Sequence, residues 1–164
     1  MSLPDDDGSP RRALLIVNEH SRSGRAAGDQ AEALLAASGL TVLRGHTNSR
    51  EDVSRRIRES RSDVDLVVVG GGDGTVSAAA PGIVDTGLPL GVLPLGTAND
   101  LARTLGLPSD LEGAAAVIAA GHTRRIDLGE VNGHPFFNVA SLGLGVDLTR
   151  ALTRDAKRLS LIHI

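Results

Sequence analysis

The chain has 164 residues and a formal net charge of −3, with 41% hydrophobic and 23% charged residues, which suits a globular chain with room for one domain and part of another. It contains no cysteine, so disulfides, thiolate catalysis and Cys-ligated zinc are excluded. Phe136 and Phe137 are its only aromatic residues, and its arginines are scattered among acidic residues. It therefore lacks the stacking platform or basic stripe of a nucleic-acid-binding protein.

The sequence predicts a cytoplasmic protein. No apolar run approaches the roughly 20 residues of a membrane span. Residues 1–11 are acidic and contain proline and glycine, unlike a secretory signal, and we expect them to form a disordered tip. Any contact with a membrane is expected to be peripheral.

The first half of the chain alternates between strand and helix patterns. Short apolar runs predict buried strands, and Ser49 with Asp52 three residues later predicts a capping box at a helix start. Gly39 stands where a helix C-cap belongs. The expected elements are strands over 12–18, 40–45 and 66–69, and helices over 25–37 and from Ser49 to about Glu59.

The second half continues the pattern with weaker signals. A helix over 75–84 should be kinked or ended early by Pro81, because proline removes a helical hydrogen bond. Ser109 and Glu112 predict a second capping box. The further expected elements are a strand over 90–93, a helix over 98–105 closed by Gly106, and a helix from Ser109 to Gly121.

This alternation predicts an α/β fold, with a mostly parallel sheet and helices on both faces, over residues 12–126. The pattern then changes. Expected strands over 124–131 and 135–142 flank Asn132-Gly133, a strong hairpin signal. The remaining residues are too few to close a sheet of normal size, so we expect residues 127–164 to begin an incomplete β-rich domain.

The chemistry is expected at Gly70-Gly71-Gly72-Asp73-Gly74-Thr75, which directly follows the strand over 66–69. Glycines here let backbone N–H groups approach an anion, and the following helix start favours negative charge. Asp73 would be repelled by phosphates unless it holds Mg²⁺ or accepts a proton from an attacking hydroxyl. A glycine-rich structural turn is the alternative.

Two further segments also follow strands, at 94–100 (PLGTAND) and 18–24 (NEHSRSG). Thr97 could contact a ligand or cap a helix, and 18–24 could be an ordinary loop. Ligands of parallel sheets bind outside the carboxyl ends of the strands, where all of these segments should meet. No Walker lysine loop, dinucleotide fingerprint or nucleophile elbow is present, and the five histidines show no metal-ligand spacing.

GGDGT after a buried strand, followed by LGVLPLGTANDLARTLGLP, resembles the diacylglycerol kinase catalytic-domain family, which includes bacterial lipid kinases and sphingosine and ceramide kinases. The resemblance runs from about Arg12 to Asp147. It implies ATP- and Mg²⁺-dependent phosphorylation of a lipid hydroxyl, with ATP bound between an α/β domain and a β-rich domain that shapes the lipid pocket.

The resemblance also implies roles for individual residues. Asp73 would be the acidic residue nearest the chemistry, and Asp147 aligns loosely with a substrate-facing acid. The metal ligands stay unknown. The implied nucleotide contacts are Asn18, Ser23, Gly24, Thr47, Gly71, Gly72, Asp73, Gly74, Thr75, Gly96 and Thr97.

The chain departs from the family pattern in two ways. Ser77-Ala78 replaces the family's frequent Asn-Glu, and further catalytic acids are expected beyond Ile164. This chain alone would then be inactive or bind ATP weakly. The alternatives are a NAD kinase, whose superfamily shares GGDGT, and a non-catalytic nucleotide-binding fragment. The lipid and the oligomeric state cannot be inferred.

Overall fold

The computed structural model of the chain describes residues 11–18 and 24–137. Four parallel strands form one sheet in the order β2-β1-β3-β4. These are β1 (Arg12–Val17), β2 (Thr41–Arg44), β3 (Leu66–Gly71) and β4 (Leu90–Pro94). The predicted α/β fold with a mostly parallel sheet is confirmed.

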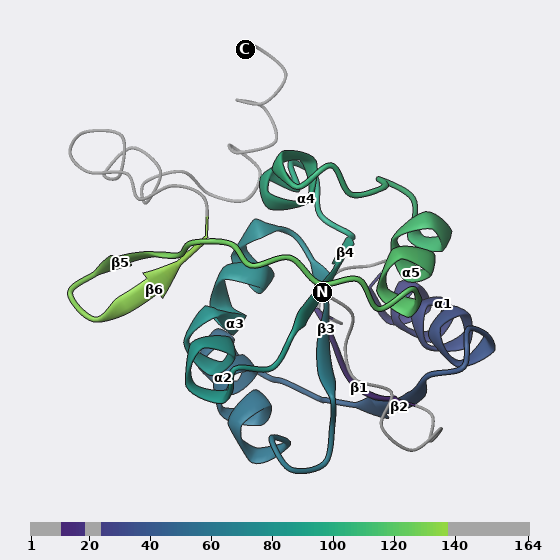
Figure 1. The fold of residues 1–164 in the computed structure, drawn as a ribbon, viewed down its shortest axis with the longest axis horizontal. Helices are drawn as coiled ribbons and strands as arrows, with labels where there is room; N and C mark the ends of the chain where they lie inside the picture. The colour runs from purple at the N-terminus through teal and green to yellow at the C-terminus, as the bar shows by residue number, and fades with distance from the viewer. Residues whose placement is uncertain (1–10, 19–23, 138–164) are drawn as a thin grey trace.

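Helices cover both faces of the sheet (Figure 1). Alternate strand residues point to opposite faces, so Leu14 and Ile16 pack with α2 and α3, whereas Ala13 and Leu15 pack with α1 and α5. Both faces are therefore apolar, which explains the uninterrupted hydrophobic strands in the sequence. The helices are α1 (Gly24–Ala37), α2 (Arg50–Glu59), α3 (Asp73–Thr86) and α5 (Leu111–Ala119).

The strand order reverses direction beside β1. The chain passes from β1 to β2 on one side, and then crosses to place β3 on the other side of β1. Such a switch point leaves a crevice at the carboxyl ends of the strands, because the connecting loops diverge there. The segments after β1 and β3, which begin at Asn18 and Gly72, lie at this position.

The expectation that Pro81 ends α3 early is wrong. The helix continues for 14 residues with Pro81 inside it. The Ser54 hydroxyl of α2 donates to the Ala78 carbonyl at 2.7 Å and accepts from the Gly82 N–H at 3.0 Å. The serine thus bridges the interrupted hydrogen-bond ladder beside the proline, so the helix can continue.

Two further helix starts differ from expectation. Helix α4 (Asp100–Thr104) begins two residues late, because Asn99 has a φ of 51° and cannot be part of the helix. The predicted capping box of Ser109 and Glu112 is wrong, since α5 is capped by Asp110, which accepts from the Gly113 N–H at 2.7 Å. The helix begins one residue later than the pattern suggested, which places Asp110 at the N-cap.

The predicted hairpin is present, with strands β5 (Gly129–Val131) and β6 (His134–Phe136) in an antiparallel pair. Asn132 and Gly133 both have positive φ, as a tight primed turn requires. The strands are shorter than expected, and residues 138–142 lie outside the described part. The hairpin contacts α3 through β6, and Phe137 packs against the core on that face.

Candidate active site at the carboxyl edge of the sheet

A pocket of about 450 Å³ opens where α2 and α3 begin. We call it the α2–α3 pocket. Three loops that are distant in sequence line it, one after each of β1, β2 and β3. Its volume lies in the range of small-molecule sites. The lining residues are Asn18, Thr47, Asn48, Ser49, Arg50, Val53, Gly72, Gly74, Thr75 and Ala78.

The start of α3 provides a backbone donor to this pocket. Gly72 is the N-cap, so the N–H of Gly74, which lines the pocket, falls in the first turn, where a helix supplies no internal acceptor. Glycine is needed here for space, since no residue in the run from Gly70 to Gly74 has positive φ. A Cβ on Gly71 would lie 2.7 Å from the Thr75 side chain.

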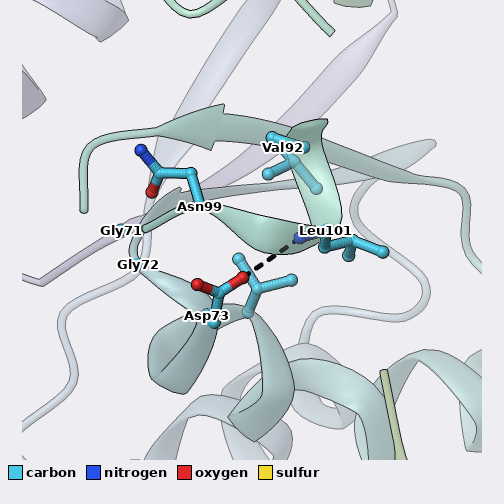
Figure 2. A pocket seen from close by; sticks show the side chains of 8 residues that line it. Gly71, Gly72, Asp73, Val92, Asn99 and Leu101 are labelled. Carbon is cyan, nitrogen blue, oxygen red and sulfur yellow. Dashed lines mark hydrogen bonds between the residues drawn. The ribbon is translucent and has the colours of Figure 1, made fainter. Parts of the chain in front are cut away.

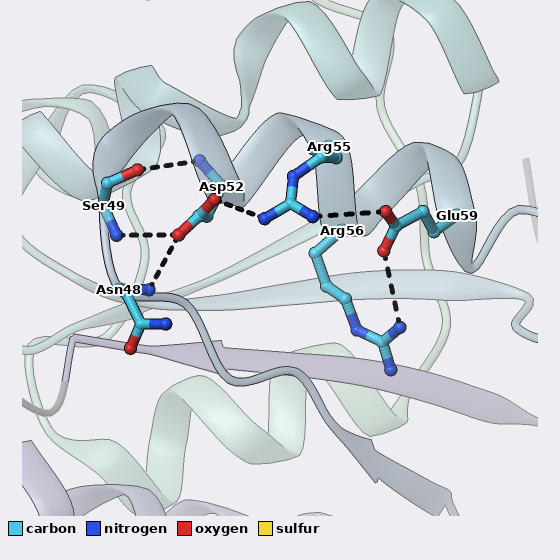
Figure 3. Close-up of polar contacts among 6 residues, drawn as sticks. All are labelled: Asn48, Ser49, Asp52, Arg55, Arg56 and Glu59. Carbon is cyan, nitrogen blue, oxygen red and sulfur yellow. Dashed lines mark hydrogen bonds and ion pairs between the residues drawn. The ribbon is translucent and has the colours of Figure 1, made fainter.

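The start of α2 forms the opposite wall, and the predicted capping box is confirmed there (Figure 3). Asp52 accepts from the N–H groups of Asn48 and Ser49, both at 3.1 Å. Its hydrogen bond from Arg55, followed by that from Asn48, lowers the pKa of Asp52 below its usual value. These bonds fix the loop that carries Thr47 into the pocket.

Arg50 joins the two walls. Its Nη2 donates to the Gly74 carbonyl at 2.8 Å, across 24 residues of sequence. Among the described residues that line the pocket, it is the only charged one. Sequence reasoning missed Arg50, because an arginine in the first turn of a charged helix resembles an ordinary solvated side chain.

Asp73 faces the other side of the loop after β3 (Figure 2). Its Oδ1 accepts from the Leu101 N–H in the first turn of α4, at 3.1 Å. Its Oδ2 takes part in no hydrogen bond with the described residues and is directed away from α4. The carboxylate lines a narrow recess that Gly72 also lines. Gly72 thus separates Asp73 from the α2–α3 pocket.

The loop after β4 packs tightly against this motif. A Cβ on Gly96 would lie 2.3 Å from the Gly72 Cα, so only glycine fits. The Gly96 N–H donates to Asn99 Oδ1 at 2.9 Å, and Asn99 in turn donates to the Gly96 carbonyl at 2.8 Å. Asn99 therefore closes this loop on itself.

A family model matches the part of the chain that contains both loops. The model of the diacylglycerol kinase catalytic domain matches residues 12–131. The chain belongs to this family. The match includes the whole four-stranded sheet, both glycine loops and the start of the hairpin.

Diacylglycerol kinase family relatives agree in sequence and fold. A protein of Klebsiella pneumoniae named "Probable lipid kinase YegS-like" is 37% identical over 84% of this chain and 47% of its own length. A diacylglycerol kinase of Staphylococcus epidermidis is 44% identical over 52% of this chain and 28% of its own. The chain spans less than half the length of these two curated relatives.

Solved structures show the same fold. A diacylglycerol kinase of Bacillus anthracis is 28% identical, covers 85% of this chain and 51% of its own length, and has a TM-score of 0.65. A second solved protein of that bacterium is 35% identical, covers 78% of this chain and 47% of its own, and has a TM-score of 0.70.

Five of the nucleotide contacts predicted for this chain line the α2–α3 pocket: Asn18, Thr47, Gly72, Gly74 and Thr75. Gly71 and Asp73 line the neighbouring recess. Gly24 is buried at the start of α1, and Thr97 is exposed, and both lie outside these two pockets. Ser23 and Asp147 lie outside the described residues.

The residues present fit a phosphate chain better than a metal ion. Backbone amides, neutral polar side chains and one guanidinium suit an anion. No group of three or more His, Cys, Asp or Glu residues that could hold a metal is found in the described part of the chain. Of the described residues that line the pocket or the recess, Asp73 alone is acidic. Mg²⁺ binding thus stays an expectation from the family. Within residues 11–18 and 24–137, no helix is both long and apolar enough to cross a bilayer.

Proposed function

We propose that this chain is the nucleotide-binding part of an ATP-dependent lipid kinase, which transfers the γ-phosphate to a hydroxyl of diacylglycerol or a sphingoid-like lipid. One observation carries the proposal: the loops after three strands converge on a single pocket with one charged side chain, a cation, at the switch point of the sheet. Family membership supports lipid phosphorylation, and the relatives' names refer to diacylglycerol or lipid.

The regions on the two sides of Gly72 would have different roles in the reaction. The α2–α3 pocket would hold the phosphates through the amide of Gly74 and the hydroxyl of Thr75. Asp73 Oδ2 would orient the lipid hydroxyl and accept its proton. The hydroxyl oxygen forms a bond to the γ-phosphorus as the bond between that phosphorus and the β–γ bridging oxygen breaks, and ADP leaves.

The domain assignment follows the same reasoning. Residues 12–126 would form the nucleotide-binding domain, and residues 127–164 would begin a β-rich domain that shapes the lipid pocket. The hairpin of β5 and β6 supports this, because it is antiparallel and separate from the main sheet. A cytoplasmic enzyme that meets its lipid at the membrane surface fits this arrangement.

The test is transfer of label from γ-labelled Mg-ATP, with total lipid extract and NAD offered in separate tubes and Asp73→Asn as the control variant. Organic-soluble label that is lost in Asp73→Asn supports the proposal. Label on NAD instead supports a NAD kinase. Binding of ATP with no transfer to either acceptor supports a non-catalytic nucleotide-binding fragment if it persists in a chain extended beyond Ile164.

A further inference from the structure

Arg50 is the charged side chain that the described residues contribute to the α2–α3 pocket. The other described residues that line the pocket are neutral, so within this set the guanidinium favours an anionic ligand. It lies directly over the first turn of α3, since a Cβ on Gly74 would lie 3.2 Å from Arg50 Nη2. The side chain thus stands where a ligand of the α3 amides would bind.

Most N–H donors of the Arg50 guanidinium are available for a ligand. Arginine carries five N–H donors and no acceptor. One donor is used by the Gly74 carbonyl. Four are left for a ligand, in the forked geometry that matches two phosphate oxygens.

Arg50 also lacks the acidic partner that five of the described arginines have. Ion pairs in the described part of the chain hold Arg44, Arg55, Arg56, Arg58 and Arg103, and none includes Arg50. The nearby carboxylate of Asp52 is already engaged by Arg55.

Arg50 lies between two helix starts. It occupies the first turn of α2 and lies on the first turn of α3. Both helix N-termini carry partial positive charge, which favours anions. Glu51 and Asp52 in α2 and Asp73 in α3 offset part of this charge, and a bound anion beside Arg50 would offset more of it.

We propose that Arg50 binds the phosphate chain of the nucleotide and makes affinity depend on the number of phosphates. This inference rests on the proposed nucleotide-binding function. The competing explanation is that Arg50 only holds the Gly74 carbonyl and thereby positions α3. A positioning role would affect every ligand of the pocket alike, whereas phosphate binding affects only ligands that carry phosphate.

The experiment measures dissociation constants of ATP, AMP, adenosine and inorganic tripolyphosphate by isothermal titration, for the unsubstituted chain, Arg50→Gln and Arg50→Lys. Arg58→Gln is the matched control, since it removes the same charge from the same helix outside the pocket. Thermal unfolding of each variant verifies that it folds.

We expect Arg50→Gln to raise the dissociation constants of ATP and tripolyphosphate about 10-fold, because a lost charge-assisted hydrogen bond is worth roughly this factor. The dissociation constant of AMP should rise less, and that of adenosine by less than about twofold. Arg50→Lys should keep part of the affinity, since it keeps the charge but not the fork. Arg58→Gln should change none of them.

Equal ATP affinity in Arg50→Gln and the unsubstituted chain would overturn the inference and leave the proposed function intact. An equal loss for ATP and adenosine would assign Arg50 a positioning role only. Arg50-dependent binding of tripolyphosphate without binding of ATP would retain the anion site and refute the nucleotide function. Binding of no probe would refute both.

Discussion

Asp73 Oδ1 accepts a hydrogen bond from the Leu101 N–H at 3.1 Å, so a carboxylate in the first turn of α3 caps the start of α4 (Figure 2). One side chain thereby ties the loop after β3 to the loop after β4. Any role of Asp73 in phosphoryl transfer is combined with this structural role, and the two can be separated by substitution.

Asp73→Asn should keep the cap and lose the base, since an amide oxygen still accepts the Leu101 N–H but does not take up a proton. Asp73→Ala should lose both. We expect the alanine variant to be less stable than the asparagine variant by about 1 kcal/mol, as for other lost caps. In a chain extended beyond Ile164, phosphoryl transfer should fall at least about 100-fold in both. Urea unfolding and the label assay measure the two effects.

Gly96→Ala should destabilise the fold strongly. Its Cβ would lie 2.3 Å from the Gly72 Cα, which is backbone and cannot rotate away. We expect a loss of about 2–3 kcal/mol, as in other overpacked sites, measured by urea unfolding. Gly87→Ala is the comparison, because Gly87 has open space but a φ of +67°. Gly87→Ala should lower the free energy of unfolding by about 1 kcal/mol. If both variants cost the same, the close approach of the two loops is not the limiting factor.

Ser54→Ala should destabilise the chain through α3 rather than α2. The hydroxyl bridges the Ala78 carbonyl and the Gly82 N–H in a buried position, and its removal leaves both poorly satisfied. We expect a loss of about 2 kcal/mol in the free energy of unfolding. The exposed Ser62→Ala provides the matched control and should change stability by less than about 0.5 kcal/mol. Equal effects of the two substitutions would contradict the bridging role.

The capping box of α2 should contribute stability that depends on pH. Because the folded pKa of Asp52 is lowered from 3.8, its contribution is present above pH 3.8 and is lost as pH falls through the folded value. Asp52→Asn should therefore be less stable than the unsubstituted chain at pH 7, with a gap that narrows below pH 3.8 and in 1 M salt. Urea unfolding at several pH values measures this gap. A stability difference that stays constant with pH would refute the pH-dependent contribution of Asp52. Substitution of the exposed Asp127 by Asn is the control.

Local signals predicted most of the fold. Apolar runs identified all four strands of the parallel sheet, the Ser49–Asp52 spacing identified the start of α2, and Asn132-Gly133 identified the hairpin. Each signal depends on neighbouring residues only. The gathering of Asn18, Thr47 and Thr75 in one pocket was also predictable, because parallel strands place their carboxyl ends at one edge.

What could not be predicted depends on contacts across the chain. The continuation of α3 past Pro81 needs a hydroxyl from another helix, 28 residues away from Gly82. Gly96 is an implied nucleotide contact, but its N–H donates to Asn99, which is evident only from the loop geometry. Arg50 is a candidate site residue because it contacts Gly74, and the residues next to it in the sequence do not indicate that contact.

The bridge between Ser54 and α3 constrains the order in which the sequence can change. Pro81 is compatible with an uninterrupted α3 because the serine already supplies the missing link. If Ser54 were replaced, the Ala78 carbonyl and the Gly82 N–H would lose this bridge while proline still occupied position 81. Substitutions at positions 54 and 81 should therefore have coupled effects on stability, although the residues belong to different helices.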